Sequence, residues 1–359
     1  MKILDRYLTV EYLRNLILVT GCFVALFLII DFFEKIRMFL TNNATLAQMA
    51  AFFLYRIPMI VSQILPASTL LTALMTYGYL SRHSEIVAVK ANGISLYRLS
   101  LPVLTIAVLI SLSIFFLNEW ITPYTNQKSE YIRLIEVQKR QSLGTFKQDQ
   151  IWYRGQKGIY NFKLFDVQSN RLRGITIYHM GPDMSLSMRI DAEWGEWQDG
   201  RWQLHNVLVT RFKAGEFPLL ENHNQYLIDL PEKPDDFKIV QKNVETMGYS
   251  ELKRYIGKLQ SEGFDATRYM ADLHGKIAFP LVCVILAVIG MAFSLRSERS
   301  GGIAQGIGIG LLIGFSYWLV FAFGISLGRS GAIPPLPAAW LGNILFSIIS
   351  AVLLYRIKT

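Results

Sequence analysis

Apolar residues gather in long runs that charged residues do not interrupt. Four runs carry no charge: 99–117 and 277–295, of 19 residues each, 303–327, of 25 residues, and 338–354, of 17 residues. An α-helix needs about 20 apolar residues to cross the hydrocarbon core of a bilayer. Each run therefore predicts a membrane span.

Two further runs are less regular. Residues 57–80 contain Pro58 and Pro66, which membrane helices tolerate because neighbouring helices satisfy the freed carbonyl groups. Residues 16–30 reach the length of a span only when the run continues past Asp31 to Phe32 and Phe33. A cleaved signal peptide would end in small residues, which are missing here, so we interpret this run as a retained span. The sequence thus predicts six spans.

The pattern changes between the third and fourth spans. A helix-prone polar stretch, 126–141, is expected to continue the third span outward. Segments of period two follow it, and this period is typical of half-buried strands. Asp199-Gly200, between two tryptophans, predicts a tight hairpin. Helical spacing returns at Leu252, Ile256 and Leu259, with Gly263 as the end of that helix and Asp265 as a cap for the next. The predicted strands cover 151–154, 159–164, 174–178, 189–194, 202–212 and 226–230.

These patterns predict an α-helical membrane protein with six transmembrane helices (3+3) and an inserted all-β domain, a sandwich or jelly roll. Residues 1–118 would hold the first three spans, 119–275 the β domain with flanking helices, and 276–359 the last three spans.

Composition supports a membrane protein, since 52% of the residues are hydrophobic and the mean hydropathy is +0.30. Lys and Arg in the short loops divide ten to three between the two sides of the membrane, which predicts that both termini are cytoplasmic. The basic balance of +9 therefore reflects topology and does not indicate a nucleic-acid partner. The ten are Lys2, Arg6, Arg14, Arg82, Lys90, Arg98, Arg296, Arg299, Arg356 and Lys358, against Lys35, Arg37 and Arg329.

Signals for catalysis are weak. The chain has no phosphate-binding glycine loop of the P-loop type, its five histidines lack metal-ligand spacing, and Cys22 and Cys283 lie inside predicted spans. Ionisable residues, which ion-coupled carriers place in mid-membrane, are almost missing from the spans. We therefore expect no catalytic, cofactor or metal site in this chain, and an energy source outside it.

The most informative segment, 81–95, is short, basic and helix-competent, and carries one acid, Glu85. Ser81 could cap a helix that Gly93 ends, with Glu85, Ala88, Val89 and Asn92 on one face. Such a helix suits insertion into the groove of a cytoplasmic partner. An ordinary amphipathic connector on the lipid surface explains the same composition.

Charged residues also cluster at the outer ends of the first three spans. Anchoring and mutual salt bridges would account for them, and so would a rim that meets anionic head groups above an apolar cavity. The cluster consists of Asp31, Glu34, Lys35, Arg37, Arg56, Lys128 and Arg133.

Small residues recur every fourth position in the fifth span, at Gly302, Gly306, Gly310 and Gly314. This ridge lets another helix approach closely. It indicates either ordinary helix packing or a gating contact.

Several motifs, taken in order, resemble the LptF/LptG family of lipopolysaccharide-export permeases, most closely its LptG branch. The resemblance covers nearly the whole chain. Its motifs are Leu4-Asp5-Arg6-Tyr7, Arg82-His83-Ser84-Glu85-Ile86-Val87-Ala88 with Gly93-Ile94-Ser95, Glu119-Trp120-Ile121-Thr122-Pro123, Gly174-Ile175-Thr176-Ile177-Tyr178, Trp202-Gln203-Leu204, Leu252 to Gly263, Lys276 and Pro280.

The resemblance implies a permease subunit of an ABC transporter in the inner membrane of a Gram-negative bacterium. Such a subunit pairs with an LptF-type permease, takes lipopolysaccharide from the outer leaflet and is driven by an LptB-type ATPase dimer, which binds ATP and Mg²⁺. An LptC-type single-span protein and an LptA-type bridge would receive the lipid from the periplasmic β-jelly-roll domain.

The resemblance also implies roles for particular residues. Arg82, Glu85, Ala88, Val89 and Gly93 would form the coupling segment, with Glu85 docked in the ATPase groove. Lys35, Arg37, Lys128 and Arg133 would meet the substrate. Asp31 departs from the family pattern, because some relatives carry a lysine there.

Two other classes stay open at this stage. A membrane-anchored scaffold or sensor would use the β domain only to bind partners. A lipid-modifying enzyme would need convergent acids, bases or a metal.

Overall fold

The computed structural model divides into two compact units. One consists of Met1–Arg133 and Val244–Thr359 and is helical, and the other, Leu134–Asn243, contains the β-strands. The flanking segments of the predicted insert, 119–133 and 244–275, thus belong to the helical unit. The structure describes residues 2–139, 144–147, 150–154, 158–166, 171–180, 185–198, 200–212, 217–228, 244–261, 265–296 and 303–356.

The described residues of the helical unit contain six helices that are long and apolar enough to cross a membrane, which confirms the six predicted spans. The third span continues outward through two π-helical segments, as predicted from residues 126–141. The elements are α1 (Lys2–Thr41), α2 (Leu46–Arg82), α3 (Glu85–Ala91), α4 (Leu96–Phe116), η1 (Leu117–Ile121), α5 (Thr122–Tyr131), η2 (Ile132–Val137), η3 (Val244–Thr246), α7 (Tyr249–Ser261), α8 (Thr267–Arg296), α9 (Ile303–Arg329) and α10 (Pro335–Tyr355).

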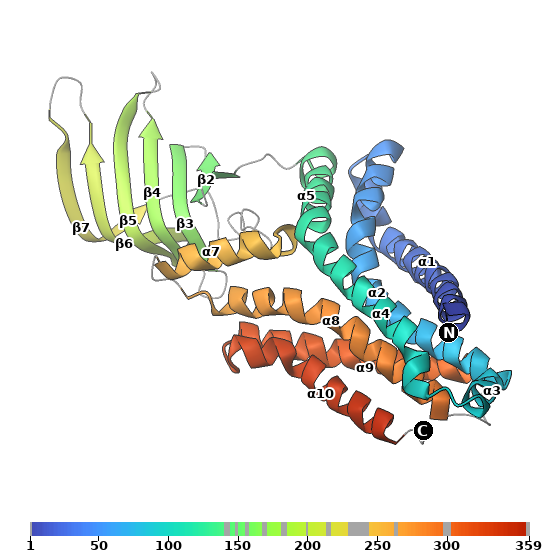
Figure 1. The fold of residues 1–359 in the computed structure, drawn as a ribbon. Coiled ribbons are helices and arrows are strands. Elements are labelled where there is room, and N and C mark those ends of the chain that lie inside the picture. Colours follow the sequence, from blue (N-terminus) through green and yellow to red (C-terminus); the bar gives the residue numbers. More distant parts are fainter. Residues whose placement is uncertain are drawn as a thin grey trace. The chain divides into compact units, whose positions relative to one another are not determined.

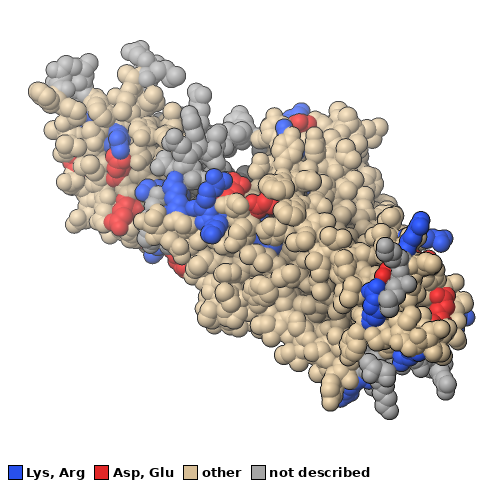
Figure 2. Space-filling view, viewed as in Figure 1, with Lys and Arg blue, Asp and Glu red and all other residues tan. Residues whose placement is uncertain are grey.

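The helical unit has two distinct ends. Both chain termini and α3 lie at one end, and the turns between α1 and α2 and between α9 and α10 lie at the other (Figure 1). On the face seen in Figure 2, a broad belt without charged residues separates the two ends. This arrangement fits helices that cross a bilayer, whose core disfavours charge.

Local sequence explains how α2 begins and why it follows α1 after a short turn. Asn43 adopts a left-handed backbone (φ 51°), which asparagine tolerates well. The Thr45 hydroxyl accepts from the amide of Gln48, and the Gln48 side chain accepts from the amide of Thr45. This reciprocal capping box satisfies two amides that the start of a helix leaves free.

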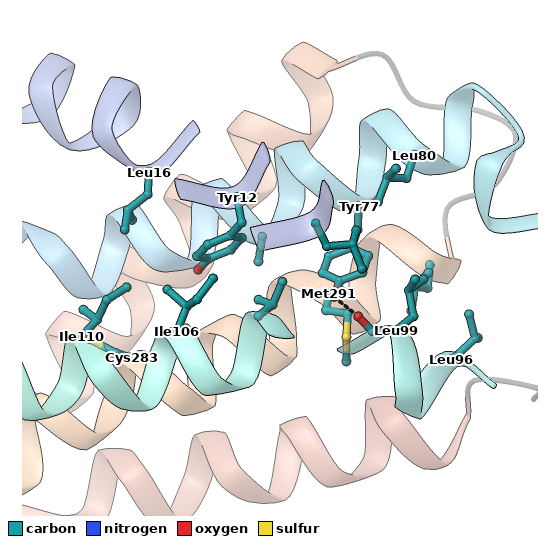
Figure 3. Packing of buried hydrophobic residues seen from close by; sticks show 14 of the residues in the cluster. Tyr12, Leu16, Tyr77, Leu80, Leu96, Leu99, Ile106, Ile110, Cys283 and Met291 are labelled. Atoms are coloured by element: carbon teal, nitrogen blue, oxygen red, sulfur yellow. Dashed lines mark hydrogen bonds between the residues drawn. The ribbon is translucent and has the colours of Figure 1, made fainter. Parts of the chain in front are cut away.

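One apolar cluster joins α1, α2, α3, α4 and α8 at the end that carries α3 (Figure 3). Two buried tyrosines satisfy their hydroxyls on backbone carbonyls: Tyr12 donates to Thr69 (3.2 Å) and Tyr77 to Leu99 (3.1 Å). Apolar side chains are solvated by lipid as favourably as by a neighbouring helix. Hydrogen bonds between helices are therefore important for holding the membrane helices together.

A second cluster joins α2 to the last three spans. The Tyr317 hydroxyl of α9 donates to Asn343 Oδ1 of α10 (2.8 Å), and Asn343 Nδ2 donates to the carbonyl of Ala278 in α8 (2.7 Å). The buried Asn343 thereby bridges three helices.

The β unit is a seven-stranded antiparallel sheet in which each strand pairs with the next in the chain. All six predicted strands are present. Asp229 and Leu230 of the last predicted strand, and Asp199 of the predicted hairpin, lie outside the described residues. The strands are β1 (Gly144–Lys147), β2 (Gln150–Arg154), β3 (Gly158–Asp166), β4 (Arg171–Met180), β5 (Leu186–Gln198), β6 (Arg201–Arg211) and β7 (Leu219–Ile228).

The prediction of an inserted all-β domain is confirmed, but the strand order is a meander. A jelly roll requires crossed Greek-key connections between two sheets. Here short connections join strands that are neighbours in the sheet, and Gln198 pairs with Arg201 across the predicted hairpin, where Gly200 has φ 82°. Buried residues of β3 to β7 form an apolar core that includes the fully buried Trp202.

Candidate functional site

The short helix α3 differs from its prediction at its start. Ser81 belongs to the last turn of α2, which continues to Arg82, so the expected cap at Ser81 is wrong. Ser84 precedes α3 in a left-handed conformation (φ 59°) and its side chain makes no capping bond. The predicted end is confirmed, since Gly93 follows the helix with φ 74°, which glycine adopts without strain.

The faces of α3 also differ from the prediction. Ile86 is buried in the apolar cluster of the helical unit, and Val89 packs against the same cluster. Val89 therefore faces inward, whereas Val87, Ala88 and Ala91 are exposed. These three residues form the outer face of α3.

Glu85, in the first turn of α3, contacts the start of the chain. The Tyr7 hydroxyl of α1 donates to Glu85 Oε2 at 3.2 Å and lies 3.5 Å from Oε1. Nearby, Arg98 of α4 forms an ion pair with Asp5 of α1 (2.6 Å). Arg82, at the end of α2, is exposed.

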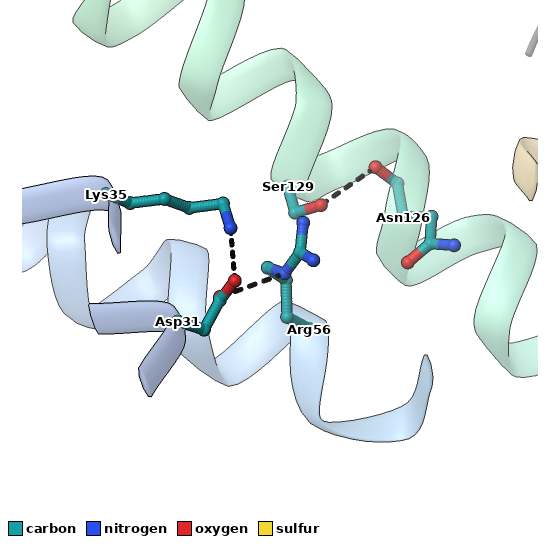
Figure 4. A network of polar contacts seen from close by, with 5 residues as sticks. All are labelled: Asp31, Lys35, Arg56, Asn126 and Ser129. Carbon is teal, nitrogen blue, oxygen red and sulfur yellow. Dashed lines mark hydrogen bonds and ion pairs between the residues drawn. The ribbon is translucent and has the colours of Figure 1, made fainter. Parts of the chain in front are cut away.

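At the opposite end of α1, Asp31 is almost fully buried, with 4% of its surface exposed. Lys35 of the same helix donates to Asp31, and Arg56 of α2 lies with Nε 3.3 Å from Asp31 Oδ2 (Figure 4). In this network two cationic side chains pair with one carboxylate. Figure 4 also shows two polar residues of α5, where the Ser129 hydroxyl donates to the carbonyl of Asn126 (3.0 Å).

The cations proposed to meet the substrate differ in whether they are paired with an acid. Arg133 is paired with Glu130 (2.5 Å), much as Lys35 is paired with Asp31. Arg37 and Lys128 are exposed, and the described residues give neither an acidic partner. The Lys128 ammonium lies 5.9 Å from the centre of the Tyr124 ring.

The part of the glycine ridge that the structure describes packs inside this chain. A Cβ atom on Gly310 would lie 2.6 Å from a methyl of Leu74, and one on Gly314 would lie 3.8 Å from Leu70, both in α2. Gly306 lies in α9, and Gly302 is outside the described residues. These contacts favour helix packing as the role of Gly310 and Gly314.

Sequence reasoning gave no role to the side chains that fasten the start of α7. Glu119, in the π-helical turn η1, accepts hydrogen bonds from the amides of Tyr249 and Ser250. Lys276 of α8 donates to the carbonyl of Met247 (2.9 Å), and Asn126 donates to that of Glu245 (3.1 Å). Only the motifs around Glu119 and Lys276 pointed to this region, and they did not show that the two residues serve one segment.

Taken together, these features define a multi-pass membrane protein with an inserted β unit, an exposed short helix at one end and cations at the other. The family model "Lipopolysaccharide export system permease LptF/LptG" matches residues 6–356, and the chain belongs to this family.

Curated relatives match over almost their full length. The chain is 24% identical over 362 residues to the lipopolysaccharide export system permease protein LptG of Escherichia coli K12, covering 99% of this chain and 98% of the relative. It is 23% identical over 355 residues to LptG of Haemophilus influenzae, covering 98% of this chain and 97% of the relative.

Proposed function

We propose that this chain is a permease subunit of an ABC transporter that extracts lipopolysaccharide from the outer leaflet of the inner membrane. The observation that carries the proposal is the family match from residue 6 to residue 356, which includes all six spans and the β unit. The extracted lipid passes to a periplasmic bridge that leads toward the outer membrane.

The energy for extraction comes from a separate, LptB-type ATPase dimer, and this chain has no enzymatic activity of its own. The chain presents α3 to that dimer. The Glu85 carboxylate and the apolar outer face of α3, Val87, Ala88 and Ala91, combine one charged anchor with a small apolar surface. Such a surface suits a hydrophobic groove with a basic edge.

The protein lies in the inner membrane of a Gram-negative bacterium with both termini and α3 in the cytoplasm. Lys and Arg are more frequent in the short loops of the end that carries the termini and α3, which supports this orientation. The β unit is then periplasmic, where it meets an LptC-type protein and an LptA-type bridge. An LptF-type permease completes the membrane cavity.

The outer ends of α1 and α5 meet the phosphorylated head of the lipid. Arg37 and Lys128 make the first contacts, because they are exposed and have no acidic partner among the described residues. Lys35 and Arg133 are already paired with acids and bind phosphate only by exchanging those partners.

The proposal is tested with the complete transporter reconstituted in vesicles that contain lipopolysaccharide. Wild-type chain copurifies with one ATPase, one related six-span protein and one single-span protein, and releases lipid when ATP is added. Glu85→Ala should lower the affinity for the ATPase, or the amount of lipid released per ATP hydrolysed, by roughly tenfold. This is the size expected for the loss of a charged hydrogen bond at an interface.

The matched control for assembly is Glu34→Ala, which removes an exposed acid at the other end of α1 and should leave copurification with the ATPase unchanged. Normal assembly and lipid release by Glu85→Ala would remove the docking role from Glu85. Copurification without any ATPase would instead favour a scaffold.

A further inference from the structure

We infer that Tyr7 is a positioning residue that holds the Glu85 carboxylate in the geometry needed for docking to the ATPase. The inference rests on the proposed function. It assigns to the start of α1 a task in energy coupling that the family match does not supply.

The contact joins residues far apart in sequence. The Tyr7 hydroxyl approaches both carboxylate oxygens of Glu85, at 3.2 Å and 3.5 Å, and 78 positions separate the two residues. Glu85 is half-buried in this position. A glutamate side chain has several rotatable bonds, so a fixed donor reduces the number of conformations it samples before docking.

The helix that carries Glu85 needs this external support. At seven residues, α3 is too short to be stable by itself, and Ser84 gives it no side-chain cap. Ile86 and Val89 hold its inner face by apolar packing. Tyr7 adds a polar side-chain contact at its first turn.

The same two turns of α1 hold the start of α4. Asp5 forms an ion pair with Arg98 (2.6 Å), and Leu4 and Leu8 pack with the cluster that contains Ile86. The start of α1 thus contacts the first turn of α3 through Tyr7 and the start of α4 through Asp5. This geometry gives a physical task to Asp5 and Tyr7 in the motif Leu4-Asp5-Arg6-Tyr7.

The hydrogen bond leaves Glu85 able to bind a partner. An ionised carboxylate accepts at about four lone-pair positions, and a single hydroxyl occupies only part of them. Tyr7 and donors of the ATPase can therefore contact Glu85 at the same time.

The test is a double-mutant cycle on the affinity of the permease complex for the ATPase, measured by titrating the ATPase onto permease in lipid nanodiscs. Tyr7→Phe removes one hydroxyl and should weaken the affinity about fivefold, the value of one hydrogen bond. ATP hydrolysis at saturating ATPase should stay unchanged, because the docked complex keeps its contacts. In the Glu85→Ala background, Tyr7→Phe should have no further effect.

The matched control is Tyr97→Phe, which makes the same chemical change on an exposed residue at the start of α4. Thermal unfolding of each permease without ATPase detects any loss of fold. Because a purely structural Tyr7 would act independently of Glu85, an undiminished effect of Tyr7→Phe in the Glu85→Ala background overturns the inference. Wild-type affinity of Tyr7→Phe, when Glu85→Ala binds weakly, also overturns it. If Glu85→Ala itself binds normally, the docking role in the proposed function fails and this inference fails with it.

Discussion

The buried ion network around Asp31 gives the sharpest test of the helical unit. Asp31→Asn keeps the size of the side chain but removes its charge, and leaves Lys35 and Arg56 without their carboxylate. Because the side chains of these two cations are only 16% and 15% exposed, water compensates them poorly. We expect the substitution to destabilise the packing of α1 against α2.

The size of the loss follows from the geometry. Two unit charges 3.3 Å apart, the Arg56–Asp31 distance, attract by about 5 kcal/mol at an effective dielectric constant of about 20. Desolvation offsets most of this attraction in the intact pair, but removal of one partner costs about 3–5 kcal/mol because a buried charge stays behind. The remaining exposure of both cations places the expected loss near the lower limit, at about 3 kcal/mol.

The loss is measured as the free energy of unfolding in mixed detergent micelles, followed by circular dichroism. The control is Asp5→Asn, since the Asp5–Arg98 pair is about one-third exposed on both sides and should contribute only about 0.2–1 kcal/mol. Adding Arg56→Gln to Asp31→Asn removes one stranded cation and should restore part of the loss. The reasoning is refuted if Asp31→Asn costs no more than Asp5→Asn, or if Arg56→Gln deepens the loss.

Two further predictions concern α9 and the start of α8. Gly310→Leu should destabilise the helical unit by about 1–3 kcal/mol in the same unfolding assay, because its Cβ would meet Leu74, whereas Gly308→Leu has open space and should cost little. The hydroxyl and amide of Thr267 both donate to Asp265 and hold the pKa of its carboxyl below the usual range. The stabilisation of α8 is therefore present above the ordinary Asp pKa of about 3.9 and is lost as the pH falls through the lowered value. Weaker protection against hydrogen exchange at the first turn of α8 in acid, measured relative to the intrinsic exchange rate at each pH, would show this loss. A pH dependence of that protection that persists in Asp265→Asn would contradict it.

Sequence patterns predicted the helices and strands well where the surroundings of a segment favour a single pattern of apolar residues. Residues 277–295 and 338–354 must be helical in a bilayer because no water satisfies their backbone groups. The strands around Trp202 alternate because one face of the sheet is buried and the other is wet. In both places a single solvent boundary determines the pattern, so local sequence is sufficient.

Contacts between distant residues could not be predicted in this way. Asp31 and Arg56 were recognised as rim charges that could form salt bridges, but only the fold shows that these two pair with each other and that the carboxylate is buried. The face of α3 was misassigned because seven residues with Val87, Ala88 and Val89 in succession have no clear apolar side. The strand order could not be predicted either, since strand spacing does not distinguish a meander from crossed connections.

Polar residues inside the spans determine how α1 is oriented. Lipid contacts the exposed Ile17 and Leu18 as favourably as another helix would, so apolar burial alone does not select a face of α1. Hydrogen bonds do select one: Tyr12 donates to the carbonyl of Thr69 (3.2 Å), and Asn15 donates to the hydroxyl of Thr76 (3.1 Å). These contacts fix the rotation of α1 against α2 near the end that carries Glu85, and the Asp31 network fixes it again near the rim. The few polar residues of a hydrophobic span therefore carry structural information that its hydropathy does not.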